Sequence, residues 1–363
     1  MQQEIIKLLE QEGKPMAPDA LFGKLEDKEA AVRALDQLLS EGALLFTRKG
    51  KLVLPAQTDL AFGRIQGHPR GFGFFIPDTG AKDAFVPSDA MHGAMHQDKV
   101  WVRLMEHVSH NGSPEAEVAF IARRANCQLV GTFERDRRLG GFVVPDETRI
   151  PMDVLIHEPD VNDASPGDKV VVEIIDYPDG RRPMTGAVKE VLGSKYKAGV
   201  DILSIVRQYG LPAEFKKSAA RQARSYKNPD TDAIARREDL RRLPIVTIDG
   251  ADAKDLDDAI SLQPLANGNA LLSVHIADVS AYVAEGSAID QEAYARGTSV
   301  YLIDHVIPML PPELCDGVCS LTSGTDKLTL SLFMEVDKQG NVVRHRFSES
   351  VISTRHRLVY EDV

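Results

Sequence analysis

The chain carries the sequence VTIDGADAKDLDDAI at residues 246–260. An apolar run leads into Asp249, and Asp255, Asp257 and Asp258 follow at offsets of 6, 8 and 9. At a separation of ~4 Å, two carboxylates repel each other by on the order of 1 kcal/mol in water and about 4 kcal/mol at an effective dielectric of about 20. Because apolar segments flank the acids on both sides, we expect folding to press the carboxylates together. A positive counter-charge is then required.

A divalent cation is the natural counter-charge for such a group of oxygens. Mg²⁺ is usually held by a few carboxylates together with waters and substrate phosphate. Two such ions, about 3.5–4 Å apart, stabilise both the attacking and the leaving oxygen of a phosphodiester. A solvated acidic loop is the alternative interpretation. A calcium loop fits poorly, because the acids do not alternate and no glutamate closes the loop.

Two further motifs follow in order within about 75 residues of the acidic stretch. The first is VHIADVS at residues 274–280, and the second is VIPMLP at residues 306–311, followed by Cys319-Ser320-Leu321. Together with the acidic stretch, these motifs resemble the catalytic domain of the ribonuclease II/ribonuclease R family of 3′→5′ exoribonucleases. The resemblance is nearer to the ribonuclease R branch.

The resemblance implies a role for each acid. Asp249 and Asp258 would hold Mg²⁺ (Mn²⁺ is the alternative ion) with help from Asp255. Asp257 would position a second ion or the activated water, and its loss should stop hydrolysis while leaving RNA bound. Asp255 and Asp257 are therefore the catalytic candidates, and all four acids are metal-ligand candidates. Tyr301 would stack near the 3′-terminal nucleotides, with a buried core tyrosine as the alternative.

The family chemistry is processive hydrolysis of single-stranded RNA from its 3′ end to nucleoside 5′-monophosphates. The family's later arginine, its second base-stacking aromatic residue and its S1-type domain have no counterpart in these 363 residues. We therefore expect this chain to bind RNA weakly and to hydrolyse it poorly or not at all. Within the motifs, His275 and Asp278 are expected to be scaffold, and Asp252 is expected to face solvent.

Length and composition limit the classes of protein to which the chain can belong. The length predicts several domains, and 43% hydrophobic with 27% charged residues is ordinary for a soluble protein. A net charge of −11 argues against a simple nucleic-acid binder, so RNA must meet local basic surface. The three cysteines form no disulfide framework, and the amino terminus lacks a secretion signal. We expect a cytoplasmic monomer with no membrane association. Its expected partner is single-stranded RNA, with the ribosome or the RNA-decay machinery as further candidates.

Residues 1–57 predict a winged-helix-like domain. Helical spacing recurs three times, the last in Val32, Leu35, Leu38 and Leu39, and a hairpin with the basic turn Arg48-Lys49-Gly50-Lys51 follows. Such a module can place a helix in a DNA groove. A transcription factor that acts on duplex DNA is therefore one rival function. A non-catalytic RNA-binding or regulatory protein is the other.

Residues 58–124 predict an OB-type barrel that resembles a cold-shock domain. Glycines separate aromatic residues in RGFGFFIP (70–77), which leaves flat rings on a strand where unstacked bases can lie. A buried aromatic core is the alternative. The residues predicted to contact RNA are Phe72, Phe74, Phe85, Arg64 and Arg70, beside His68.

Residues 125–195 repeat this pattern with fewer aromatics and predict a second cold-shock barrel. Its Arg135, Arg137 and Arg138 would contact the RNA backbone, or would only pair with Glu134 and Asp136. Residues 196–240 predict a basic helical connector, and residues 241–363 the amino-terminal part of the catalytic domain. The chain as a whole predicts a multidomain α+β fold: a winged-helix module, two OB-type cold-shock β-barrels and the start of a mixed α/β catalytic domain.

Overall fold

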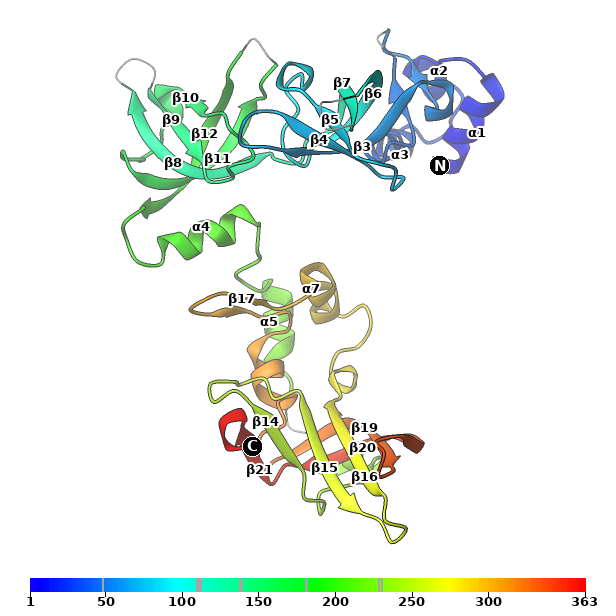
Figure 1. The fold of residues 1–363 in the computed structure, drawn as a ribbon, viewed down its shortest axis with the longest axis vertical. Helices are drawn as coiled ribbons and strands as arrows, with labels where there is room; N and C mark the ends of the chain where they lie inside the picture. Colours follow the sequence, from blue (N-terminus) through cyan, green and yellow to red (C-terminus); the bar gives the residue numbers. More distant parts are fainter. Residues whose placement is uncertain (48, 109–112, 137–139, 180–181, 228, 230) are drawn as a thin grey trace. The chain divides into compact units, whose positions relative to one another are not determined.

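The computed structural model describes residues 1–47, 49–108, 113–136, 140–179, 182–227, 229 and 231–363 (Figure 1). These residues form two compact units, Met1–Gly210 and Leu211–Val363. Each unit has its own buried cores, and each is described here by itself. No helix in the described ranges is long and apolar enough to cross a membrane.

The first unit begins with three helices and a short antiparallel hairpin: α1 (Gln2–Glu12), α2 (Pro18–Phe22), α3 (Lys28–Ser40), β1 (Leu45–Phe46) and β2 (Leu52–Val53). The Asp27 side chain caps α3 by accepting a hydrogen bond from the Ala30 amide at 2.9 Å. Met16 forms a bridge to Leu52, so the segment between α1 and α2 joins the hairpin. Val32, expected on the apolar face of α3, is 46% exposed because Ala31 and Ala34 take the buried positions.

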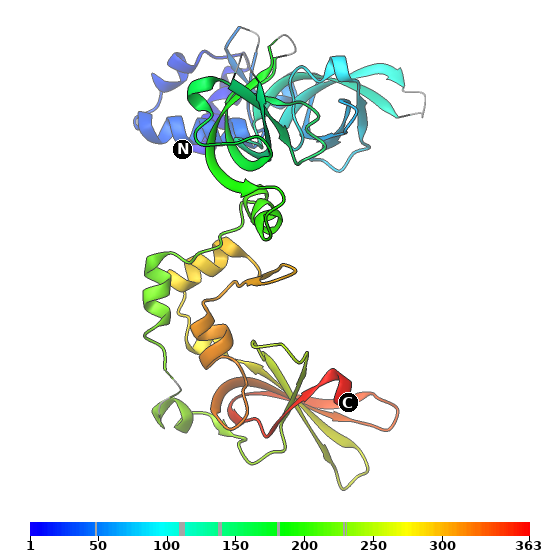
Figure 2. The same cartoon turned by 90° about the vertical axis from the view of Figure 1, so that its left-hand side faces the viewer.

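Two closed five-stranded barrels follow, as the sequence predicts. The strand order is β3-β4-β5-β7-β6 in the first barrel and β10-β12-β11-β8-β9 in the second, so the two share one topology. Figure 2 shows the ribbon of both barrels. In both barrels the third and fifth strands pair in parallel. The strands are β3 (Leu60–Gly67), β4 (Gly73–Pro77), β5 (Ala84–Val86), β6 (Lys99–Val108), β7 (Pro114–Arg123), β8 (Gln128–Asp136), β9 (Gly140–Pro145), β10 (Val154–Ile156), β11 (Asp168–Asp176) and β12 (Met184–Ser194).

Alternation along these strands separates a packed interior from a solvent face. Ile65 on β3 and Phe75 on β4 are fully buried in the first barrel, whereas Phe74 points outward and is 37% exposed. Phe133 occupies the corresponding interior of the second barrel. Helix α4 (Val200–Gln208) closes the first unit by packing Val200 against Val130 on the outside of the second barrel.

The second unit is built on a seven-stranded sheet of order β13-β20-β19-β16-β15-β14-β21. Helices α5 (Lys217–Ala223) and α7 (Ala288–Arg296) pack Ala219 and Ile289 into its apolar core. A separate two-stranded hairpin is formed by β17 (Val300–Tyr301) and β18 (Val306–Ile307). The remaining α-helix and strands are α6 (Thr231–Ala235), β13 (Glu238–Asp239), β14 (Val246–Asp249), β15 (Asp258–Pro264), β16 (Ala270–Ala277), β19 (Asp326–Val336), β20 (Val342–Ser353) and β21 (His356–Val359).

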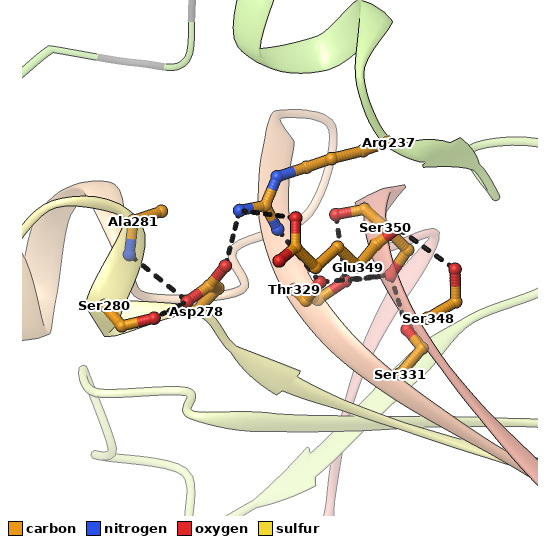
Figure 3. A network of polar contacts seen from close by, with 9 residues as sticks. All are labelled: Arg237, Asp278, Ser280, Ala281, Thr329, Ser331, Ser348, Glu349 and Ser350. Atoms are coloured by element: carbon orange, nitrogen blue, oxygen red, sulfur yellow. Dashed lines mark hydrogen bonds and ion pairs between the residues drawn. The ribbon is translucent and has the colours of Figure 1, made fainter.

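A chain of buried polar side chains crosses the neighbouring strands β16, β19 and β20 of this sheet. Figure 3 shows its part on β19 and β20, formed by Thr329, Ser331 and Ser350. His275 shares a 2.6 Å hydrogen bond with Ser331, and Ser331 one of 2.5 Å with Ser350. Ser350 in turn lies 2.7 Å from the Thr329 hydroxyl. His275 is fully buried, so burial lowers its pKa to about 4. The structure thus places His275 in the scaffold.

This buried histidine makes the stability of the second unit depend on pH. Between pH about 6.5 and about 4, the unfolded chain binds a proton at His275 that the folded chain excludes, so stability is lost as the pH falls through that window. The full loss is about 3 kcal/mol. Thermal unfolding from pH 7 to pH 4 should show a smaller decline in His275→Gln. His305→Gln, at an exposed site, should follow the original chain; equal slopes for all three proteins would contradict the assignment.

Candidate metal centre and RNA-binding surface

The acidic stretch spans two neighbouring strands at one end of the sheet. Asp249 is the last residue of β14 and Asp258 the first of β15, and the two strands pair through Val246 and Ile260. The intervening loop carries Asp255 and Asp257. The connection between β14 and β15 therefore places all four predicted ligands at the same end of the sheet. Asp252 in the same loop is exposed, as expected.

The downstream motifs hold this loop in place. The Ser320 hydroxyl donates to the Lys254 carbonyl at 2.7 Å and accepts from the Leu256 amide at 3.2 Å. The amides of Leu321 and Ala277 donate to the carbonyls of Leu256 and Asp257 at 2.7 and 2.9 Å. Leu256 is buried between the two acids, Asp255 and Asp257, that precede and follow it. These contacts explain why motifs so far apart in sequence occur together.

Arg357 makes a further support that the sequence did not indicate. One guanidinium nitrogen, Nη2, lies 3.0, 2.9 and 2.8 Å from the carbonyl oxygens of Gly250, Ala251 and Ala253. Arg357 reaches them because β21 pairs in parallel with β14, opposite Thr247. The contact joins residues more than 100 positions apart, so no local pattern could have revealed it.

Removing this arginine should loosen the acidic loop. We expect Arg357→Gln to weaken Mn²⁺ binding about tenfold, because three carbonyls lose a charged donor worth about 1.5–3 kcal/mol. Titration calorimetry with Mn²⁺ would measure the change. Arg355→Gln, whose guanidinium donates instead to the Arg242 carbonyl, is the matched control. Unchanged affinity in Arg357→Gln would show that the loop keeps its shape alone.

Two carboxylates at this end of the sheet have raised pKa values, in part because of the neighbouring carboxylates. The pKa of Asp249 is raised, first by its removal from water and then by Asp258 and Asp257, while Arg357 opposes the shift. The pKa of Asp257 is also raised, by partial desolvation and by Asp258 and Asp255. One oxygen of Asp249, Oδ2, is buried without a hydrogen-bond partner. A buried, unpaired carboxylate oxygen is costly unless a cation or proton meets it.

The side chains nevertheless do not form a complete metal-binding site. Within the described residues, no three acidic, histidine or cysteine side chains converge closely enough to hold an ion. The donor set still fits a hard divalent cation, since it consists of carboxylates alone and includes the unpaired Asp249 oxygen.

Tyr301 joins the acidic edge from the β17–β18 hairpin. Its hydroxyl donates to Asp255 Oδ2 at 3.1 Å, and Asp255 raises the pKa of the phenol. The ring is 68% exposed, so the alternative of a core tyrosine is wrong. The VIPMLP motif supplies β18, where Val306 pairs with Tyr301. That motif therefore presents the tyrosine beside the acids.

The predicted RNA-contacting aromatics form one cluster on the first barrel. The Phe72 ring lies 5.8 Å from Phe74 and 5.4 Å from Phe85, and Phe74 lies 6.0 Å from Phe85. His68 stacks on Phe72 at 4.1 Å with only 11° between the rings. Arg64 and Arg70 are exposed on the same barrel. The cluster is a surface feature, unlike the buried Phe75.

The second barrel offers no comparable aromatic surface in its described part. Arg135 forms an ion pair with Glu158 at 2.5 Å. Arg137 and Arg138 lie outside the described residues.

Family models match residues in both barrels and in the second unit. A model described as Ribonuclease B OB domain matches residues 63–121, one described as cold shock domain matches 142–216, and one described as RNB domain matches 237–363. Two OB-type barrels ahead of a mixed α/β RNB region define the class of protein. Ribonuclease R of Acidithiobacillus ferrooxidans is 38% identical over 367 residues, covering 99% of this chain and 83% of that protein. The chain belongs to the ribonuclease R family.

Other relatives extend beyond this chain. Ribonuclease R of Thermotoga maritima is 40% identical over 98% of the chain, which spans 51% of that protein. Among solved structures, RNase R of Mycoplasma genitalium in complex with ribose-methylated single-stranded RNA has a TM-score of 0.76 and 26% identity, covering 83% of this chain and 48% of that one. Yeast Ssd1, a pseudonuclease, shares the fold at 17% identity, with a TM-score of 0.69 over 85% of this chain and 45% of that one.

Proposed function

We propose that this chain is the RNA-binding and cation-binding part of a 3′→5′ exoribonuclease that hydrolyses single-stranded RNA processively to nucleoside 5′-monophosphates. The observation that carries the proposal is the set of four carboxylates at one sheet edge, with the unpaired Asp249 oxygen and with Tyr301 on Asp255. The chain spans about half the length of the Thermotoga relative. Hydrolysis is therefore proposed for the protein at its relatives' length, and RNA binding for these residues.

At this site Asp249 and Asp258, with help from Asp255, would hold Mg²⁺, or Mn²⁺ in its place, and Asp257 would position a second ion or the attacking water. Bound divalent cations supply charge neutralisation and an activated water at neutral pH. The Tyr301 ring supports the 3′-terminal nucleotide, while its hydroxyl fixes Asp255. Leu256, anchored by Ser320 and Leu321, keeps Asp255 and Asp257 on opposite sides of one buried residue.

Single-stranded RNA is the proposed partner of the first barrel. Phe72, Phe74 and Phe85 would stack on bases, and Arg64 and Arg70 would meet phosphates. Stacking on an aromatic ring contributes about 1–3 kcal/mol per base, which offsets the unfavourable overall charge. Two Mycoplasma RNase R structures in complex with single- and double-stranded RNA support RNA as the ligand class.

The amino-terminal module is proposed to be a winged helix that contacts RNA or protein. Three helices, the β1–β2 hairpin and the Met16–Leu52 bridge support this assignment. Arg48 of the predicted basic turn lies outside the described residues. The turn's Lys49 and Lys51 are exposed.

The fold alone also admits a non-catalytic RNA-binding protein, since the pseudonuclease Ssd1 shares it. Competition between labelled oligo(A) RNA and duplex DNA, across a salt series, tests the ligand class. RNA should win at every salt concentration, whereas preference for the duplex would favour a DNA-binding factor. Mn²⁺ titration then distinguishes the exoribonuclease from the non-catalytic RNA-binding protein. Mn²⁺ binding that is abolished in Asp249→Asn supports the exoribonuclease, and the lack of Mn²⁺ binding supports the non-catalytic protein.

A further inference from the structure

The β17–β18 hairpin that presents Tyr301 is too small to be stable by itself. It consists of two residue pairs, Val300 with Ile307 and Tyr301 with Val306, and an isolated two-stranded hairpin is at best marginally stable in water. Its tip is exposed, since Ile303 is 91% and Tyr301 68% exposed, whereas Ile307 at its base is buried. The orientation of Tyr301 must therefore be set from the base of the hairpin.

Arg296 lies at that base, as the last residue of α7 and ahead of β17 (Figure 1). Its side chain is only 2% exposed. The guanidinium nitrogen Nη1 donates to the Pro308 carbonyl, directly after β18, at 3.2 Å. Because Arg296 precedes the first strand and Pro308 follows the second, this contact closes the two ends of the hairpin. A second hydrogen bond, from the Met309 amide to Ser299 Oγ at 3.0 Å, closes the same base.

The other donors of Arg296 fix its guanidinium in place. Nε and Nη2 each donate to Glu292 Oε1, one turn earlier on α7, at 3.1 Å. Nη1 and Nη2 donate to the carbonyls of Pro212 and Glu214 at 2.8 Å. The guanidinium carbon also lies 3.7 Å from the centre of the Phe215 ring. Each N–H of the guanidinium thus has an acceptor, an arrangement that needs the rigid planar fork of arginine and that lysine cannot reproduce.

The contact between Tyr301 and Asp255 is too weak to order the hairpin from the other end. The Tyr301 hydroxyl donates to Asp255 Oδ2 at 3.1 Å, and a hydrogen bond to a charged group contributes at most about 3 kcal/mol. Ordering the backbone of one residue costs about 1–2 kcal/mol, so this bond offsets the cost for only a few residues. The interactions that order the hairpin must therefore include those at its base.

We propose that Arg296 is a positioning residue for the reaction: by closing the base of the β17–β18 hairpin, with Ser299 as a second tie, it holds the Tyr301 ring beside Asp255. The proposal rests on the proposed role of Tyr301 at the cation-binding carboxylates. Arg296 acts only through Tyr301, because the acceptors of its N–H groups all belong to the protein. A displacement of about 1 Å caused by a change far from the reacting atoms can lower a rate on the order of 10²-fold.

Paramagnetic broadening by Mn²⁺ measures the position of Tyr301 in the full 363-residue chain. Mn²⁺ bound at the carboxylates should broaden the ring resonances of Tyr301 strongly, because its hydroxyl lies 3.1 Å from Asp255. Tyr301→Phe assigns these resonances. At saturating Mn²⁺, Arg296→Lys should reduce the broadening several-fold, because a ring released from its base moves away from the ion. Ser299→Ala, which removes the weaker tie and no buried charge, should reduce the broadening less.

Two controls separate this positioning role from a general loss of stability. Gln291→Ala lies on the same helix, but Gln291 donates to the Gly286 carbonyl ahead of that helix. Asp278→Ala removes a buried ion pair with Arg237 in the same unit. Both variants should keep the full broadening of Tyr301, because neither change touches the base of the hairpin.

The possible outcomes test the positioning role and the proposed function separately. Full broadening in Arg296→Lys overturns the positioning role and leaves the cation site standing. If Arg296→Lys does not fold, Ser299→Ala decides, and full broadening in that variant overturns the role. A Tyr301 ring that Mn²⁺ does not broaden in the original chain contradicts both the cation site assigned under the proposed function and the positioning role.

Discussion

Replacing Asp257 by asparagine is expected to abolish hydrolysis while leaving RNA bound. In the protein at its relatives' length, the rate of nucleoside monophosphate release should fall about 10³-fold, equivalent to about 4 kcal/mol of lost transition-state stabilisation. Oligo(A) affinity should stay within about twofold, because the stacking aromatics lie on the first barrel. Single-turnover assays paired with fluorescence anisotropy would measure both quantities.

The same substitution should stabilise the fold when no cation is present. The pKa of Asp257 is raised by partial desolvation and neighbouring carboxylates, so its ionised form is disfavoured in the folded chain, and stability is lost as the pH rises through that pKa. Asparagine does not ionise, so the substitution removes the free-energy cost of an ionised carboxylate at this position in the folded chain. Asp252→Asn, in the same loop but exposed, is the control for both measurements. Undiminished hydrolysis in Asp257→Asn would refute the assigned role.

Breaking the buried pair between Arg237 and Asp278 is expected to be the most destabilising single change in the second unit. Their side chains are only 10% and 11% exposed and lie 2.5 Å apart (Figure 3). Burial alone would raise the pKa of Asp278, but the hydrogen bonds from Ser280 and Arg237 lower it instead. Asp278→Ala leaves the largely buried guanidinium with only the longer ion pair to Glu349 at 3.9 Å and the Thr329 carbonyl at 3.2 Å. The expected cost of removing the carboxylate is about 3 kcal/mol.

Urea unfolding followed by circular dichroism would measure this loss. Arg224→Ala serves as the control, because Arg224 and Glu313 lie 3.9 Å apart with side chains 78% and 41% exposed. An exposed pair contributes about 0–1 kcal/mol. If both variants unfold at the same urea concentration, the pair between Arg237 and Asp278 does not anchor the unit. The VHIADVS motif would then need another explanation.

The features that could be predicted from the sequence are formed by residues that lie close together along the chain. The acidic loop is one turn between two strands, and each barrel is a series of adjacent strands, so their residues are neighbours before folding. Phe72, Phe74 and Phe85 fall within a single three-strand meander, in which Phe74 pairs with Phe85.

What sequence did not predict depends on chain segments that only the tertiary fold brings together. Arg357 reaches the acidic loop across more than 100 residues, and Arg237 meets Asp278 across 41. The role of Ser320 could not be predicted for the same reason. Its motif was recognised in the sequence, but its hydrogen bonds to Leu256 and Lys254 depend on the tertiary fold. Helical spacing likewise could not tell Val32 from the smaller Ala31 and Ala34, because either set can face a core.

The absence of side chains at Gly67 and Gly93 has a consequence for engineering and for divergence within the family. With a carbonyl from the second barrel seated against each glycine, neither barrel is a self-contained cassette. Transplanting the first barrel alone into a foreign scaffold would expose Met95, which packs into the core of the second barrel. A viable graft must move residues 60–194 together, and homologous recombination between distant relatives should tolerate breakpoints outside this span better than at the linker inside it.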